Sequence, residues 1–133
     1  GLFRSHVQEI DPEAIVVNLA VGGFTTYHVM PSGYNPPSGR PSPAPNNNIT
    51  KALSYNPVAI IINLPSNDAA NSYTSEEQMD NFATIIGAIT DLGKDYLVTT
   101  TQPRNFTNPD QRQSNRCENL NLKYLWIKCC EYF

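Results

Sequence analysis

Two polar loops contain the residues best suited to chemistry, and each follows a predicted buried strand. The first loop is Asn18–Thr25 (Asn-Leu-Ala-Val-Gly-Gly-Phe-Thr), after the apolar run Ala14–Val17. The second loop is Pro65–Asp68, after the apolar run Val58–Leu64. The carboxyl ends of parallel strands meet at one edge of an open α/β sheet, so we expect both loops to face one crevice.

These loops offer N–H donors that suit a developing negative charge. The Gly23 amide and the Asn67 side-chain amide are the donor types that form oxyanion holes. Gly22 is expected to permit the turn, and Asn18 to order the first loop through side-chain hydrogen bonds. Asp68 is expected to accept loop amides, because its charge would oppose an oxyanion. The alternatives are a plain tight turn at Gly23 and a turn asparagine bound to its own backbone.

No nucleophile and no general base accompany these donors. Ser66 has no identifiable base beside it in the sequence. His28 is the last histidine of the chain and lies in a stretch expected to be flexible. The sequence therefore predicts an oxyanion-binding half-site, with the nucleophile and the base outside this chain.

Composition indicates one globular domain and excludes several function classes. With 40% apolar and 16% charged residues among 133, the chain can bury a core. A net charge of −3 argues against a nucleic-acid partner, which would require a basic stripe. No apolar run is long enough for a membrane span. No signal-peptide pattern is present, and the compartment stays open, with secretion or the periplasm as options.

The cysteines predict neither a metal site nor a disulfide framework. Cys117, Cys129 and Cys130 match no zinc-ligand spacing, and an adjacent pair is a poor chelate. No other metal constellation exists in the sequence, and nothing in it implies an organic cofactor.

Hydrophobic periodicity and punctuation residues predict alternating helices and strands. Strands are predicted at 15–17, 58–64 and 96–101, and helices at 2–10, 48–55 and 75–92, with a further helix start at Asn108. The first two strands are expected to be buried on both faces. Ser75 and Gln78 form a predicted capping box, and Gly93 a C-terminal stop. This order indicates an α/β fold with a parallel sheet covered by helices on both faces.

Two segments stand apart from this pattern. The stretch 22–48 is rich in Pro, Gly, Ser and Asn, and is interpreted as either a functional lid or a solvated linker. The tail 114–133 differs in composition from the rest. It is either a frameshift or truncation product, or an ordinary final helix with an irregular end.

Together, the two loop motifs resemble the SGNH (GDSL-like) hydrolase family of esterases and acylhydrolases. Asn18, Ala20, Gly22, Gly23 and Thr25 match the family's second block, and Ser66, Asn67 and Asp68 match most of its third. The resemblance covers residues from about Gly1 to Gln113. The two blocks occur in the family's order, each after a strand, which makes the pair more specific than either block alone.

The resemblance implies a flavodoxin-like three-layer α/β/α sandwich, incomplete in this chain. It also implies hydrolysis of acyl or acetyl esters, with small molecules or carbohydrates as the ester substrates. In the family, serine attacks the carbonyl and histidine takes the proton. By position, Gly23 and Asn67 are the glycine and asparagine donors of the oxyanion hole.

Three departures limit the resemblance to a central fragment, residues 1–113. No Gly-Asp-Ser precedes Gly23, and no Asp-x-x-His occurs anywhere. The third block opens with Pro65 where the family has glycine, and proline fixes φ and removes an amide. The sheet would also lack the strand between 15–17 and 58–64. We therefore expect marginal stability, or direct pairing of 15–19 with 58–64. A non-catalytic flavodoxin-like binding domain or pseudoenzyme is the alternative function.

Overall fold

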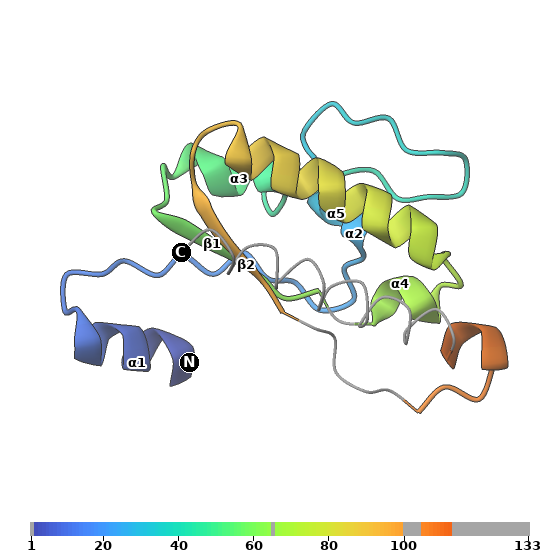
Figure 1. Ribbon diagram of the computed structural model, residues 1–133, viewed down its shortest axis with the longest axis horizontal. Coiled ribbons are helices and arrows are strands. Elements are labelled where there is room, and N and C mark those ends of the chain that lie inside the picture. Colours follow the sequence, from blue (N-terminus) through green and yellow to red (C-terminus); the bar gives the residue numbers. More distant parts are fainter. Residues whose placement is uncertain (1, 65, 100–104, 113–133) are drawn as a thin grey trace.

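A computed structural model describes residues 2–64, 66–99 and 105–112 (Figure 1). The elements in chain order are α1 (Leu2–Ile10), α2 (Thr26–Val29), α3 (Ile49–Ser54), β1 (Ala59–Ile62), α4 (Asn67–Ala70), α5 (Ser75–Thr90) and β2 (Asp95–Val98). Strands β1 and β2 are parallel neighbours, with Ile60 opposite Tyr96 and Ile62 opposite Val98. The fold is thus mixed helix and strand around a small parallel sheet, as an α/β fold requires.

Helix α5 provides the centre of the core. Its residues Phe82, Ile85 and Ile89 are fully buried and belong to one cluster with Ile62 of β1 and Val98 of β2. This is the apolar face that the helical spacing predicts. Figure 1 shows α5 running beside the two strands, with α3 near its C-terminal end.

The N-cap of α5 lies one residue before the predicted N-cap. Thr74, not Ser75, is the N-cap: its hydroxyl accepts the Glu77 amide at 3.1 Å, and Glu77 accepts the Thr74 amide at 3.1 Å. Gln78 instead donates its side-chain amide to the Tyr73 carbonyl at 3.1 Å. A glutamate is favoured over glutamine at this position because its charge complements the helix N-terminus.

The predicted strand at 15–17 does not form. Ile15 is 89% exposed and Val17 45% exposed, so the expectation of burial on both faces is wrong. The Arg4 guanidinium donates to the Val16 carbonyl at 3.0 Å, and β1 pairs with β2 alone among the described residues. An apolar run becomes a strand only where a neighbouring strand satisfies its backbone, and the expected pairing with 58–64 is absent.

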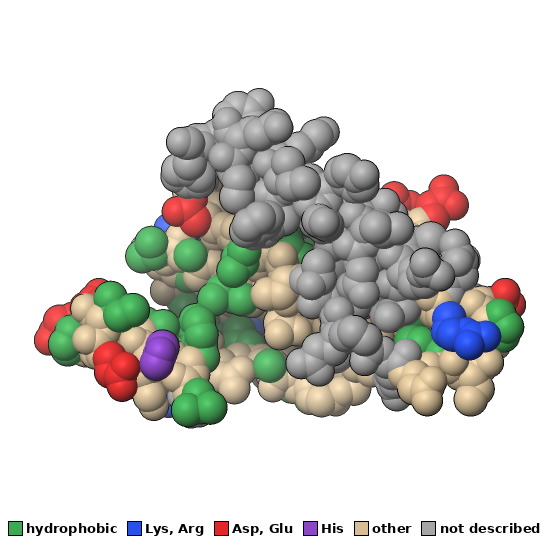
Figure 2. All heavy atoms as spheres, turned by 60° about the horizontal axis from the view of Figure 1, so that its bottom comes forward, with side chains coloured by type: hydrophobic (Ala, Val, Ile, Leu, Met, Phe, Trp, Pro, Cys, Tyr) green, Lys and Arg blue, Asp and Glu red, His purple; other side chains and the backbone are tan. Residues whose placement is uncertain are grey.

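Strand β1 is also shorter and more exposed than predicted. Its side chains alternate: Ile60 and Ile62 face the core, whereas Ile61 is 47% exposed. Its register partner Leu97 is 39% exposed. Within the described residues, helices cover one face of the sheet rather than both. Figure 2 shows further exposed apolar side chains on the α1 side of the molecule.

The stretch 22–48 is held to its neighbours by hydrogen bonds, while most residues of its middle part, 32–39, are exposed. It contains α2, and its Ala44 amide donates to the carbonyl of His28 in that helix at 2.9 Å. The Asn47 side chain donates to the Leu19 carbonyl at 3.0 Å. The segment then ends at Asn48, which accepts the Lys51 amide as the N-cap of α3, close to the predicted helix boundary.

Helix ends elsewhere follow the sequence closely. Gly93 has φ +62° after α5, and Asn108 accepts the Asp110 amide at 2.8 Å at the start of a helical turn over 109–112. No helix of the described part is long and apolar enough to cross a membrane. Pro65, the end of the third predicted strand and the cysteine-bearing tail lie outside the described residues.

Candidate active site

The first loop turns at Gly23. The Phe24 amide donates to the Val21 carbonyl at 3.4 Å, and Gly23 holds φ +84° inside this turn. Only glycine adopts that backbone geometry without strain, so Gly23 and not Gly22 permits the turn. A methyl group there would meet nothing within 4 Å, which makes the requirement conformational rather than steric. Within the described residues, the Gly23 amide donates to no protein acceptor.

Asn18 orders the start of the same loop. Its side-chain oxygen accepts the Ala20 amide at 3.0 Å, an Asx turn of the kind expected from the sequence. This contact fixes the chain before the Gly23 turn.

Asn67 joins the second loop to the first. It is the first residue of α4, and its Nδ2 donates to the Phe24 carbonyl at 2.9 Å across a separation of 43 residues. The acceptor directly follows Gly23 in the chain. The structure therefore joins the two loops that the sequence placed in separate motifs.

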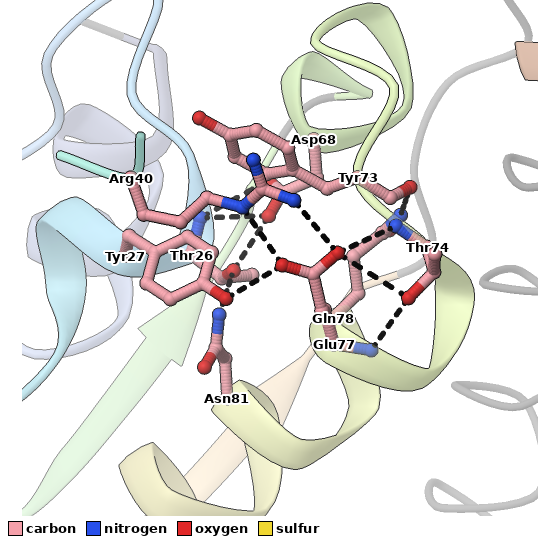
Figure 3. A network of polar contacts seen from close by, with 9 residues as sticks. All are labelled: Thr26, Tyr27, Arg40, Asp68, Tyr73, Thr74, Glu77, Gln78 and Asn81. Atoms are coloured by element: carbon pink, nitrogen blue, oxygen red, sulfur yellow. Dashed lines mark hydrogen bonds and ion pairs between the residues drawn. The ribbon is translucent and has the colours of Figure 1, made fainter. Parts of the chain in front are cut away.

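Asp68 lies beside this contact as a buried carboxylate, 1% exposed (Figure 3). The Thr26 amide donates to its two oxygens at 3.0 and 3.2 Å, and the Thr26 hydroxyl donates to Oδ1. Burial raises the pKa of Asp68 to about 6, against the opposing hydrogen bonds from Thr26. The carboxylate thus accepts a loop amide, the contact type expected from the sequence.

Asn81 of α5 completes this buried chain of hydrogen bonds. Its Nδ2 donates to the Thr26 hydroxyl oxygen at 2.8 Å, which leaves the hydroxyl proton for Asp68. No role for Thr26 or Asn81 is predicted from the sequence. One signal was available: Asn81 is polar, yet lies next to Phe82 on the predicted apolar face of its helix.

Two side chains were weighed as catalytic candidates, and the structure places both at the starts of short helices. Ser66 is 5% exposed and precedes α4 as its N-cap. His28 lies in α2 rather than in a flexible stretch, because the Thr25 amide donates to its Nδ1 at 3.0 Å. Burial lowers the pKa of His28, so the neutral ring is favoured.

A second polar cluster fastens the segment after α2 to α5 (Figure 3). The Arg40 guanidinium donates to both oxygens of Glu77 at 2.8 and 3.0 Å, and the Tyr27 hydroxyl donates to Glu77 at 2.8 Å. Arg40 also lies 4.1 Å from the Tyr73 ring centre. The hydrogen bond from Arg40 lowers the pKa of Glu77 to about 2.

Glu77→Gln is expected to lower the free energy of unfolding by about 2 kcal/mol near neutral pH. The folded-state pKa lies below the ordinary 4.5, so this stabilisation is present above pH 4.5 and is lost as pH falls towards 2. Urea denaturation at neutral and acidic pH measures the difference. Exposed Glu76→Gln is the control and is expected to change stability little. Equal losses for the two variants would contradict the assignment.

Comparison with known proteins matches no family model, no curated protein and no solved structure. Among the described residues, no group of three His, Cys, Asp or Glu side chains could hold a metal ion. The observations that bear on function are therefore the sequence motifs and the geometry around Gly23 and Asn67.

Proposed function

We propose that this chain supplies the oxyanion-binding loops of a serine esterase of the SGNH type, within a flavodoxin-like three-layer sandwich. The observation that supports this most strongly is the 2.9 Å hydrogen bond from Asn67 Nδ2 to the Phe24 carbonyl. It joins the two motif loops next to the Gly23 turn. An oxyanion hole needs its donors fixed before the reaction, and this bond fixes one loop on the other.

In the proposed reaction, a serine oxygen attacks the carbonyl carbon of an acyl or acetyl ester, carried by a small molecule or a carbohydrate. The Gly23 amide and the Asn67 side chain donate to the carbonyl oxygen as it gains negative charge. Asp68 is not a donor to this oxygen; its carboxylate accepts the Thr26 amide and hydroxyl. The serine and the histidine that takes its proton come from outside the 133 residues.

The alternative is a non-catalytic binding domain, or pseudoenzyme, that uses the same crevice for a small ligand. It is favoured by the engagement of His28 with Thr25 and by the burial of Ser66. The two functions differ in whether a nucleophile and a base join these loops.

The experiment that separates them begins with the DNA on both sides of the coding segment. We expect an in-frame Gly-Asp-Ser before Gly23 and an Asp-x-x-His after residue 113. The longer protein should then hydrolyse p-nitrophenyl acetate. A reading frame that lacks both motifs, or a longer protein without turnover, would favour the binding domain.

The chain on its own is expected to hydrolyse p-nitrophenyl acetate no faster than buffer, because it provides oxyanion donors without a nucleophile. A spectrophotometric assay of the purified chain measures this rate. Turnover well above background that is lost in Asn67→Ala would contradict the placement of the nucleophile outside this chain.

A further inference from the structure

The segment between the Gly23 turn and α2 contains a capping arrangement that depends on a histidine. In an ordinary capping box, a glutamate or glutamine at the third helical position accepts the N-cap amide. Here the N-cap is Thr25, and the residue at the third position is His28. The Thr25 amide donates to His28 Nδ1 at 3.0 Å, and the Thr25 hydroxyl oxygen lies 3.0 Å from the same nitrogen.

This hydrogen bond requires one protonation state of the imidazole. Nδ1 accepts an N–H only when it carries no proton, so the neutral ring holds its proton on Nε2. A second proton would add to Nδ1 and face the Thr25 amide proton, which leaves only the Thr25 hydroxyl oxygen as an acceptor for that nitrogen. Thr25 is 2% exposed, and its amide would then lack an acceptor away from water.

The imidazole is also fixed in orientation. The Phe24 ring stacks on it with 4.4 Å between centroids and 13° between planes, and the His28 carbonyl accepts the Ala44 amide at 2.9 Å. Phe24 is in turn the residue whose carbonyl binds Asn67. The ring therefore contacts the side chain of the residue whose carbonyl binds Asn67.

We propose that His28 is a proton-sensitive latch, which holds the Gly23 turn in place when neutral and releases it when protonated. This regulates the site described above, so its catalytic consequence rests on the proposed function. The latch itself rests only on the contacts of His28. In mildly acidic solution the Gly23 turn would become mobile, because the hydrogen bond from the Thr25 amide to His28 would be lost.

The charged groups on the neighbouring helices are bound to other residues. Asp68 of α4 binds Thr26, and Glu77 of α5 binds Arg40, Tyr27 and Thr74. Burial lowers the pKa of His28 and raises that of Asp68. Acid therefore weakens the hydrogen bond from Thr25 to His28, whereas protonation of Asp68 in acid is favoured by its burial. Their effects on global stability have opposite signs, and the test must therefore be made residue by residue.

The test is amide hydrogen exchange of the chain by NMR at about pH 7.5 and at an acidic pH where ¹⁵N shifts show the His28 ring to be protonated, corrected for the intrinsic pH dependence of exchange. Protection of the Thr25 amide is expected to fall about tenfold in acid. In His28→Gln the protection should stay constant, because glutamine completes an ordinary capping box without titrating. His6→Gln removes an exposed histidine of α1 and should keep the wild-type response. Asp68→Asn should keep it as well.

A Thr25 amide that is equally protected at both pH values would overturn the latch. So would the same acid response in His28→Gln. Should that variant not fold, ¹⁵N shifts of the wild-type ring provide the second test, since a neutral ring protonated on Nδ1 also contradicts the proposal. None of these measurements uses ester hydrolysis, so the latch and the proposed esterase function fail separately.

Discussion

Asn67→Ala is expected to lower kcat of the longer protein for p-nitrophenyl acetate by about 10² to 10³. The substitution removes one donor to the oxyanion, and it removes the hydrogen bond that holds the Phe24 carbonyl to the start of α4. Because the donor acts most strongly on the transition state, KM should change far less than kcat. Steady-state kinetics of the two purified proteins measure both constants.

The matched control for this variant is Asn71→Ala. Asn71 is exposed and follows the same helix, α4, and its side chain donates to the Asn67 backbone carbonyl rather than to the other loop. Its loss should leave kcat within about threefold of the wild-type value. Similar losses of kcat for the two variants would show that α4 packing, not the Asn67 donor, sets the rate.

At about pH 4, Asp68→Ala is expected to lower the free energy of unfolding by about 3 kcal/mol. The variant leaves the Thr26 amide and hydroxyl without their buried acceptor and interrupts the chain that ends at Asn81. Urea denaturation of the chain followed by circular dichroism measures the loss. Asp68→Asn keeps the shape and one acceptor oxygen, and should lose less than half as much.

The difference in stability between the wild type and Asp68→Asn is expected to depend on pH. The folded-state pKa of Asp68, about 6, lies above the ordinary 3.8. Its contribution is thus fully present below pH 3.8 and is lost as pH rises through 6, by up to about 3 kcal/mol. The free energy of unfolding of Asp68→Asn, relative to that of the wild type, should therefore be highest above pH 6. A difference that does not change with pH would mean that burial does not control this carboxylate.

The parts of the fold that the sequence predicts well are those set by local chemistry. The apolar stripe of α5 requires only the spacing of Phe82, Ile85 and Ile89, and all three are buried as predicted. The cap of the same helix was displaced by one residue, because Thr74 and Ser75 can both act as N-caps. The choice depends on whether a glutamate or a glutamine reaches back.

The strands were predicted less well because their state depends on partners. The run 15–17 is as apolar as a buried strand, yet apolarity does not specify which strand will pair with it. Ile61 and Leu97 are similarly apolar and remain partly exposed, on the face that no described helix covers. An apolar run indicates its own preference for a strand, but it does not indicate which strands and helices will pack against it.

The candidate site likewise has residues that the sequence predicts and supporting contacts that it does not. Glycine at position 23 and asparagine at position 67 could be selected from motif order, and the structure joins their loops through Phe24. The supporting contacts of Thr26 with Asp68 and Asn81 depend on how α2 packs against α5. Local patterns contain no such information, beyond the polar Asn81 within an apolar stripe.

The measurement that tests the oxyanion assignment most directly is a crystal structure of the longer protein inactivated by a p-nitrophenyl alkylphosphonate. The charged phosphonyl oxygen imitates the oxygen of the tetrahedral intermediate. We expect it within hydrogen-bond distance, about 2.7 to 3.1 Å, of both the Gly23 amide and Asn67 Nδ2. A phosphonyl oxygen bound by other donors, with Gly23 and Asn67 out of reach, would contradict the assignment.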